Sequence, residues 1–238
     1  MSGGSIIAES EVVPGLSQFG IRAFTTSRLS GSFGLASDEP VREVMGRWSA
    51  LRHELRPGGA RLASASQVHG AGLIIHHGGW EGWLRGGDAD GHVAADRGTA
   101  VAVLVADCVP VFLAHPSGAI ALLHSGWRGT AARIVQRGID ALAQRGCPAS
   151  DLRVHTGPAI CGKCYEVSAN VYAQLTGIDP GKPSTIDLRA VIADDARAMG
   201  VTHITTSPSC TRCDNDRFYS HRAGDLGRQL GVMMADDG

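Results

Sequence analysis

The chain has 238 residues, a length that suits one large α/β domain or two small ones. Its 22 basic and 23 acidic residues give a formal net charge of −1, so it lacks the overall positive field that attracts nucleic acids or anionic membranes. With 43% hydrophobic and 19% charged residues, the composition is that of a globular protein and excludes a wholly disordered chain.

The N-terminal residues have no basic segment followed by a continuous apolar segment, so we expect no signal peptide. The longest apolar run, 100–106, is too short to span a bilayer. Six cysteines without secretory features indicate reduced thiols or metal ligands rather than a disulfide scaffold. We therefore expect a cytoplasmic protein with no membrane or nucleic-acid partner.

The first part of the chain predicts few regular elements. We expect a flexible start over 1–18, a strand over 20–26 and a Ser/Gly-rich loop through residue 37. Apolar residues at helical spacing predict an amphipathic helix over 41–55, stopped by Pro57, Gly58 and Gly59. Segments 64–69 and 73–77 are expected to be extended, and the Gly- and Trp-rich stretch 78–91 to be a long loop.

The centre of the chain carries the strongest pattern. Residues 99–116 predict two buried strands that are interrupted at Asp107 and Cys108, and 119–127 predicts a third. Runs this apolar are typical of strands that are buried on both faces of a sheet.

In the rest of the chain, expected helices and strands alternate. A helix is expected over 130–145, ended by Gly146 and Pro148. We then expect a strand over 151–160, a helix over 167–177, a strand over 187–199 and a helix over 201–206, whereas the pattern of 226–234 fits either type. Because no repeat or break in composition divides the chain, we expect one α/β domain over 1–238.

Three residues that can bind a metal stand at the ends of apolar strands, namely His69, Cys108 and His124. Two imidazoles and a thiolate suit zinc or copper, and three protein ligands are typical of a catalytic zinc site. Two alternatives remain. Cys108 and His124 could be the nucleophile and base of a cysteine hydrolase, or all three residues could be ordinary core residues.

Two CxxC pairs form a second candidate set, Cys161 with Cys164 and Cys210 with Cys213. Four thiolates can close a structural zinc tetrahedron. The separation between the pairs exceeds the usual zinc-ribbon spacing, so free thiols in two loops remain the alternative.

Arginines flanked by glycines mark two candidate anion sites, at Arg128 and at Arg222 with Arg228. Guanidinium groups bind phosphate or carboxylate through paired hydrogen bonds, although exposed arginines are also common. Trp127 either stacks on a planar ligand or fills the core.

The strings SQVHG, ADCVPVFLA, HSGWRGT, GPAI with CYEV, and FYSHR with LGR occur in this order and resemble the YfiH or laccase-domain family. Members are described as purine nucleoside phosphorylases and as polyphenol oxidases. The resemblance covers residues 20–235. It implies a mixed α/β (α+β) fold in one domain, layered as an α/β/β/α sandwich.

The resemblance also implies site residues. It assigns a metal, Zn²⁺ or alternatively Cu²⁺, to His69, Cys108 and His124, which with Arg222 form the expected catalytic set. Arg28 is a weaker match to a second arginine of the family. The residues expected to bind substrate are Arg28, Gln67, Asp107 and Arg128; Asp107 either orients a metal ligand, accepts a proton or caps the strand turn.

Two departures from the family pattern bear on the substrate. The chain has Ser32-Phe-Gly34-Leu where the family has Ser-Leu-Asn-Leu, and His221-Arg222-Ala223 where the family has Tyr-Arg-Arg. These changes concern substrate affinity and identity more than the metal site.

The activity implied by the resemblance is phosphorolysis of adenosine, inosine and methylthioadenosine, with adenosine deamination at the same zinc site. Phosphate needs an anion clamp, for which Arg222 is the first candidate and Arg28 the second. Deamination would use the open metal position to activate water. The sequence leaves open whether the protein forms a homodimer.

Three other functions compete with this one. The first is a cysteine hydrolase or deamidase that uses Cys108 and His124. The second is a copper-dependent polyphenol oxidase, although the ten histidines form no HxH pair of the kind that holds a multicopper cluster. The third, a cell-wall precursor editing factor, rests on analogy within the family alone.

Overall fold

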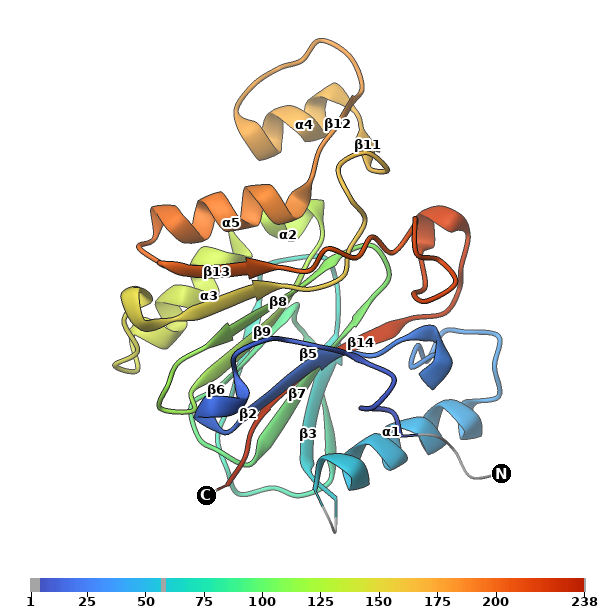
Figure 1. Cartoon of the computed structure of the whole chain (residues 1–238), viewed down its shortest axis with the longest axis vertical. Helices are drawn as coiled ribbons and strands as arrows, with labels where there is room; N and C mark the ends of the chain where they lie inside the picture. The colour runs from blue at the N-terminus through green and yellow to red at the C-terminus, as the bar shows by residue number, and fades with distance from the viewer. Residues whose placement is uncertain (1–4, 57–58, 238) are drawn as a thin grey trace.

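The computed structural model describes residues 5–56 and 59–237 and consists of two stacked six-stranded sheets with helices outside them (Figure 1). The first sheet contains, in spatial order, β1 (Glu11–Val12), β2 (Ile21–Thr25), β14 (Gln229–Ala235), β7 (Thr99–Val105), β3 (Arg61–Ser66) and β5 (Trp83–Asp88). The second contains β13 (His203–Thr206), β10 (Arg153–Thr156), β8 (Val109–Ala114), β9 (Ile120–Ser125), β6 (Gly91–Ala94) and β4 (Leu73–His76). Both sheets mix parallel and antiparallel pairs.

Helices cover the two outer faces. Helix α1 (Val41–Leu55) packs on the first sheet, and α3 (Ile134–Ala143) and α5 (Leu188–Ala198) pack on the second. This layering confirms the predicted α/β/β/α sandwich in one domain.

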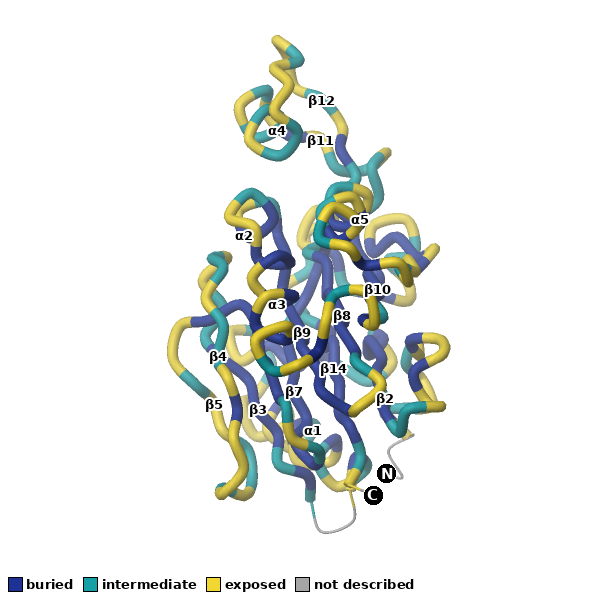
Figure 2. Tube along the Cα trace, turned by 90° about the vertical axis from the view of Figure 1, so that its left-hand side faces the viewer, coloured by how far each residue is buried: buried dark blue, intermediate teal, exposed yellow. Residues whose placement is uncertain are grey.

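The remaining elements are short. They are α2 (Trp127–Ala131), α4 (Ala169–Thr176), β11 (Glu166–Val167), β12 (Ser184–Thr185) and the 3₁₀ helices η1 (Ser17–Phe19), η2 (Arg28–Ser30), η3 (Ala149–Asp151) and η4 (His221–Ala223). Helix α4 with β11 and β12 projects from one end of the sandwich, and its residues are mostly half-buried or exposed (Figure 2).

Burial on both faces explains the long apolar runs of the central strands. In β7, Val101 and Val103 face the second sheet, whereas Ala100 and Ala102 face α1. The same alternation holds in the second sheet, where Phe112 lies between the sheets. Successive side chains therefore still alternate between the two faces of each strand, but the residues on both faces are apolar.

Three expected elements differ in type from those observed in the structure. Segment 187–199 is helical rather than extended, since Leu188, Ile192 and Ala196 recur every four residues and bury one helix face. Segment 201–206 contains the strand β13 instead of a helix. The expected long loop 78–91 contains the edge strand β5, in which exposed residues and two glycines hide the strand pattern.

The expected helix over 130–145 is divided. Arg133 has φ of 61°, a left-handed conformation that ends α2 and precedes α3. The segment 226–234, whose pattern fits either a strand or a helix, contains most of the strand β14, which pairs with β2 and β7 in the first sheet.

At the N-terminal part of the chain, two expectations lie partly outside the described residues. The predicted helix stop at Pro57 and Gly58 is one of them. Flexibility of 1–18 stays a prediction: residues 1–4 are outside the described part, while Val13 and Leu16 are buried in the core. Among the described residues, no helix has both the length and the apolar character needed to cross a membrane.

Helix α1 is held to the first sheet by Trp48. This side chain is 2% exposed, stacks on Trp83 with 4.4 Å between ring centroids, and donates from Nε1 to the carbonyl of Phe33 at 3.0 Å. We expect Trp48→Ala to lower the free energy of unfolding by roughly 3–5 kcal/mol, measured by urea denaturation. Met45→Ala on the exposed side of the same helix is the control, with an expected change within about 0.5 kcal/mol. Equal losses in the two variants would contradict this role of Trp48.

Candidate active site and its metal ligands

The three expected metal ligands converge in the structure. His69 lies in the loop after β3, Cys108 in the turn between β7 and β8, and His124 near the end of β9. The antiparallel register of β8 and β9 pairs Pro110 with His124 and so brings Cys108 close to it. The ligand atoms of the three side chains all lie within 4.8 Å of one another.

One buried carboxylate, Asp90, organises this cluster. Its Oδ1 accepts hydrogen bonds from the backbone N–H of His69 at 2.9 Å and from Nδ1 of His124 at 2.8 Å. Its Oδ2 accepts from the N–H groups of Gly70 at 2.7 Å and Val68 at 3.2 Å. Asp90 therefore shapes the His69 loop and holds the Nδ1 proton of His124, which leaves Nε2 of His124 to bind a metal.

The ionisation of Asp90 agrees with this role. Burial alone would raise its pKa, but the hydrogen bonds from His124 and from backbone N–H groups lower the pKa below the usual value. Sequence reasoning missed this residue because Asp90 lies in the expected loop and no local pattern separates it from the neighbouring Asp88.

Two glycines of the HSGWRGT string allow the close packing of the cluster. A Cβ on Gly126 would lie 2.9 Å from Sγ of Cys108 and 3.5 Å from Cδ2 of His69. A Cβ on Gly129 would lie 2.9 Å from the carbonyl oxygen of Gly70. Side chains at these positions would therefore push the three ligands apart.

The electrostatics of the cluster favour an ionised thiol. Burial raises the pKa of Cys108, but the adjacent imidazoles of His124 and His69 outweigh burial and lower that pKa to about 6. Burial lowers the pKa of His124, whereas the Cys108 thiolate and Asp90 raise it to about 9. At neutral pH the metal-free pair is thus a thiolate beside an imidazolium. Cys108 already has the form that binds metals, and His124 would release its Nε2 proton when an ion binds.

These donors fit the metal that the sequence predicts. One thiolate and two imidazole nitrogens converge, and a carboxylate fixes the tautomer of one imidazole, as in many zinc sites. The same donor types also suit copper. The chain thus has a cluster that can bind a metal, and its donor chemistry leaves the choice of ion open.

Asp107 connects the ligand Cys108 to a second loop. Its backbone is left-handed, with φ of 81°. Its Oδ1 accepts from the hydroxyl of Thr211 at 2.6 Å, and its Oδ2 accepts from the backbone N–H of Arg222 at 2.7 Å. The side chain thus anchors the loop that carries Arg222 beside the metal ligands.

Arg222, Arg128 and Tyr165 surround this side of the cluster. The guanidinium of Arg222 donates to the carbonyl of Glu166 at 3.2 Å and lies 5.2 Å from the centroid of the Tyr165 ring. Arg128 lies over the ring of Trp127, 4.5 Å from its centroid. Burial and the charges of Cys108 and Asp107 raise the pKa of Tyr165, while both arginines oppose the rise. Tyr165, which sequence reasoning named only within the CYEV string, therefore belongs to the site.

Two of the residues expected to bind substrate make structural contacts. The side-chain amide of Gln67 donates to the carbonyl of Leu104 at 2.8 Å and accepts from its N–H at 2.7 Å. The guanidinium of Arg28 pairs with Asp225 at 2.7 Å and lies over the ring of Tyr219. Both side chains thus help to hold loops in place.

The two departures from the family strings can also be placed. A Cβ at Gly34 would approach Cγ of Arg228 to 3.2 Å, so glycine here allows Arg228 to pack closely. The Arg228 guanidinium donates to the carbonyls of Asp225, Leu226 and Gly227. Ala223 ends the exposed η4.

Comparison with known proteins shows the family to which the chain belongs. Residues 24–236 match the model of the family described as multi-copper polyphenol oxidoreductase laccase. A purine nucleoside phosphorylase, ORF3, of Streptomyces griseus is 35% identical over 212 residues, which cover 85% of each chain. An adenosine deaminase, RL5, from an unknown prokaryotic organism is 34% identical over 147 residues, which cover 56% of each chain.

Structural similarity extends over nearly the whole molecule. The hypothetical protein YfiH of Bacillus licheniformis superposes with a TM-score of 0.84 at 21% sequence identity, covering 95% of this chain and 96% of the other. The chain shares its fold with the YfiH protein. Given the match over residues 24–236, it belongs to the multi-copper polyphenol oxidoreductase laccase family.

Proposed function

We propose that this protein is a metal-dependent purine nucleoside phosphorylase that acts on adenosine, inosine and methylthioadenosine and also deaminates adenosine, in the cytoplasm. The observation that carries the proposal is the convergence of His69, Cys108 and His124 beside an exposed arginine, Arg222. The names of two relatives, a purine nucleoside phosphorylase and an adenosine deaminase, support the same substrate class.

The chain's own residues have distinct tasks in this proposal. His69, Cys108 and His124 hold the metal, and Asp90 keeps the Nδ1 proton on His124 throughout the reaction. Zinc, when bound there, supplies a Lewis acid that polarises the substrate and activates water. The phenol of Tyr165 is protonated at neutral pH, and in this proposal it donates a hydrogen bond to the nucleoside.

Arg222 is the stronger of the two phosphate candidates. Its guanidinium donates only to a backbone carbonyl, and among the described residues no carboxylate pairs with it. The charge of Arg28 is instead balanced by Asp225. An arginine whose charge is not balanced by the protein is free to bind phosphate through paired, charge-assisted hydrogen bonds.

A cysteine hydrolase is the second candidate, because one observation favours it. Cys108 contacts His124, and His124 contacts Asp90, which is the arrangement of a nucleophile, a base and an orienting acid. In such a triad His69 serves only to stabilise the Cys108 thiolate. In the three-ligand metal site, His69, Cys108 and His124 are all direct ligands.

Product analysis tests the proposed activity. Zinc-loaded protein incubated with adenosine and phosphate should release adenine and ribose 1-phosphate, and without phosphate it should release inosine and ammonia. Chromatography of the nucleobases and nucleosides measures both reactions. Cys108→Ala should abolish both, whereas Cys147→Ala, which replaces a buried cysteine outside both metal clusters, should retain them.

Three outcomes would contradict the proposal. Folded, zinc-loaded protein that forms neither adenine nor inosine would reject the function. Adenine formed equally with and without phosphate would indicate a hydrolase. Full turnover in metal-free protein that is lost on alkylation of Cys108 would favour the cysteine mechanism.

The assignment of phosphate to Arg222 is tested separately. Arg222→Ala should raise the KM for phosphate by about 10- to 100-fold, because a charge-assisted interaction with the anion is lost, and should alter the KM for adenosine much less. Steady-state kinetics at varied phosphate measure this effect. The control is Arg197→Ala, an exposed arginine on α5 that pairs with Asp194. An unchanged KM for phosphate would remove Arg222 from the anion site.

A further inference from the structure

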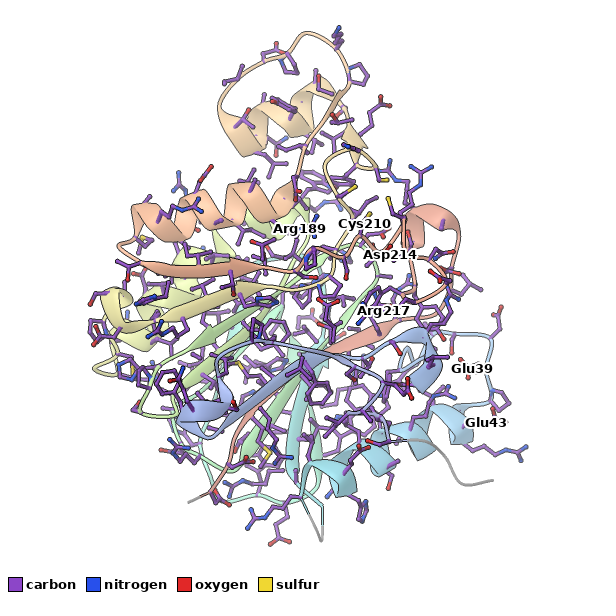
Figure 3. All side chains as sticks on the ribbon, viewed as in Figure 1. Glu39, Glu43, Arg189, Cys210, Asp214 and Arg217 are labelled. Carbon is purple, nitrogen blue, oxygen red and sulfur yellow. The ribbon has the colours of Figure 1, made fainter. Side chains whose placement is uncertain are left out.

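Four cysteines form a second cluster, separate from the His69, Cys108 and His124 site. Cys161 and Cys164 follow β10, and Cys210 and Cys213 follow β13, so the parallel pairing of these strands brings the two CxxC segments together. Figure 3 shows Cys210 among neighbouring sulfur atoms, near the base of the projecting α4 segment.

The spacing of the sulfur atoms suits one shared ion. All four lie within 4.8 Å of one another, and Sγ of Cys164 is 3.5 Å from Sγ of Cys213. In a zinc tetrathiolate with bonds of about 2.3 Å, neighbouring sulfurs lie about 3.8 Å apart. Disulfides would join the four sulfurs in two pairs with bonds of about 2.05 Å. The 3.5 Å between Sγ of Cys164 and Sγ of Cys213 is instead close to the spacing that one tetrahedral ion imposes on its sulfurs.

The backbone around the cluster is arranged for thiolates. Sγ of Cys210, which is 5% exposed, accepts from the N–H of Cys161 at 3.2 Å and from the N–H of Cys213 at 3.4 Å. A neutral thiol is a weak acceptor, so two N–H groups directed at one buried sulfur stabilise its anionic form. The cluster thus provides support from neighbouring backbone groups before any ion is bound.

Positive side chains accompany both CxxC segments. Lys163 and Arg212 occupy equivalent places, each directly before the second cysteine of its pair. Arg212 also donates to the carbonyl of Cys164 at 3.3 Å, which links the two segments. Because four thiolates and one divalent ion carry a net charge of −2, nearby cations reduce the cost of assembling them.

We propose that Cys161, Cys164, Cys210 and Cys213 bind one zinc ion with a structural role. Four protein ligands fill the tetrahedron and leave no position for water or substrate, which distinguishes this site from a catalytic one. The ion joins the segment after β10 to the segment after β13.

The joined segments form one wall of the candidate active site. The first carries Tyr165 and the Glu166 carbonyl that accepts from Arg222. The second carries Thr211, which donates to Asp107, and leads to Arg222 itself. We infer that the structural zinc holds this wall in place. This consequence for the active site rests on the proposed function, whereas the proposal that the four cysteines bind zinc is independent of it.

Metal analysis tests the site directly. Protein purified under reducing conditions should contain two zinc ions per chain, and Cys108→Ala should retain one. X-ray absorption at the zinc edge of Cys108→Ala should then show four sulfur neighbours at about 2.3 Å and no nitrogen. The paired substitution Cys164→Ser with Cys213→Ser should lose this ion and keep the other, while Cys147→Ala should keep both.

Several results would overturn the proposal. They are a folded Cys108→Ala protein without zinc, nitrogen or oxygen neighbours around its zinc, iron in place of zinc, or a disulfide detected by intact mass. The Cys108→Ala measurements decide the question even if the paired serine variant fails to fold, since they leave all four cysteines in place.

Hydrogen exchange separates the structural role from the proposed function. Loss of the ion in the paired serine variant should speed amide exchange in 157–168 and 207–225 but not in β8 and β9. If the function is also correct, the KM for phosphate should rise. If the protein binds zinc through four sulfurs but does not turn over nucleosides, the structural zinc site is supported and only the proposed function is rejected.

Discussion

The Asp90 carboxylate is the interaction on which the candidate active site depends. It has no exposure to solvent, yet it is fully satisfied by three backbone N–H groups of the His69 loop and by Nδ1 of His124. A buried charge is tolerated only with such partners, so the loop and the histidine are fixed together. The same contact selects the tautomer of His124 and supports the metal-binding form of the cluster.

The sandwich explains why a rigid site can form at the ends of its strands. The central strands are buried on both faces, between the other sheet and the covering helices, so their ends have little freedom. Cys108 and His124 come from neighbouring segments of the second sheet, and Gly126 allows them to approach closely. The α4 segment projects beyond this core (Figure 2).

The candidate ligand sets could be predicted from the sequence, whereas the residues that support them could not. His69, Cys108 and His124 interrupt apolar runs, and the four paired cysteines stand out by spacing alone. Asp90 gains its role only through tertiary contacts, so no local pattern reveals it. Likewise Arg28 resembles a ligand-binding arginine in sequence but is neutralised by Asp225 in the fold. The error at α5 arose because the four-residue spacing of Leu188, Ile192 and Ala196 was not recognised as helical, and the error at β13 arose in a short segment whose type was decided by packing.

The most direct test of the role of Asp90 is the zinc affinity of Asp90→Asn, measured by competition with a chromophoric chelator. The amide keeps the shape of the side chain but replaces one oxygen by a donor that faces N–H groups. We expect zinc at His69, Cys108 and His124 to bind about 10- to 100-fold more weakly, with the fold retained. Asp88→Asn, at the exposed neighbouring position, should bind zinc like the unmodified protein. An unchanged zinc affinity in Asp90→Asn would contradict the claim that this carboxylate organises the site.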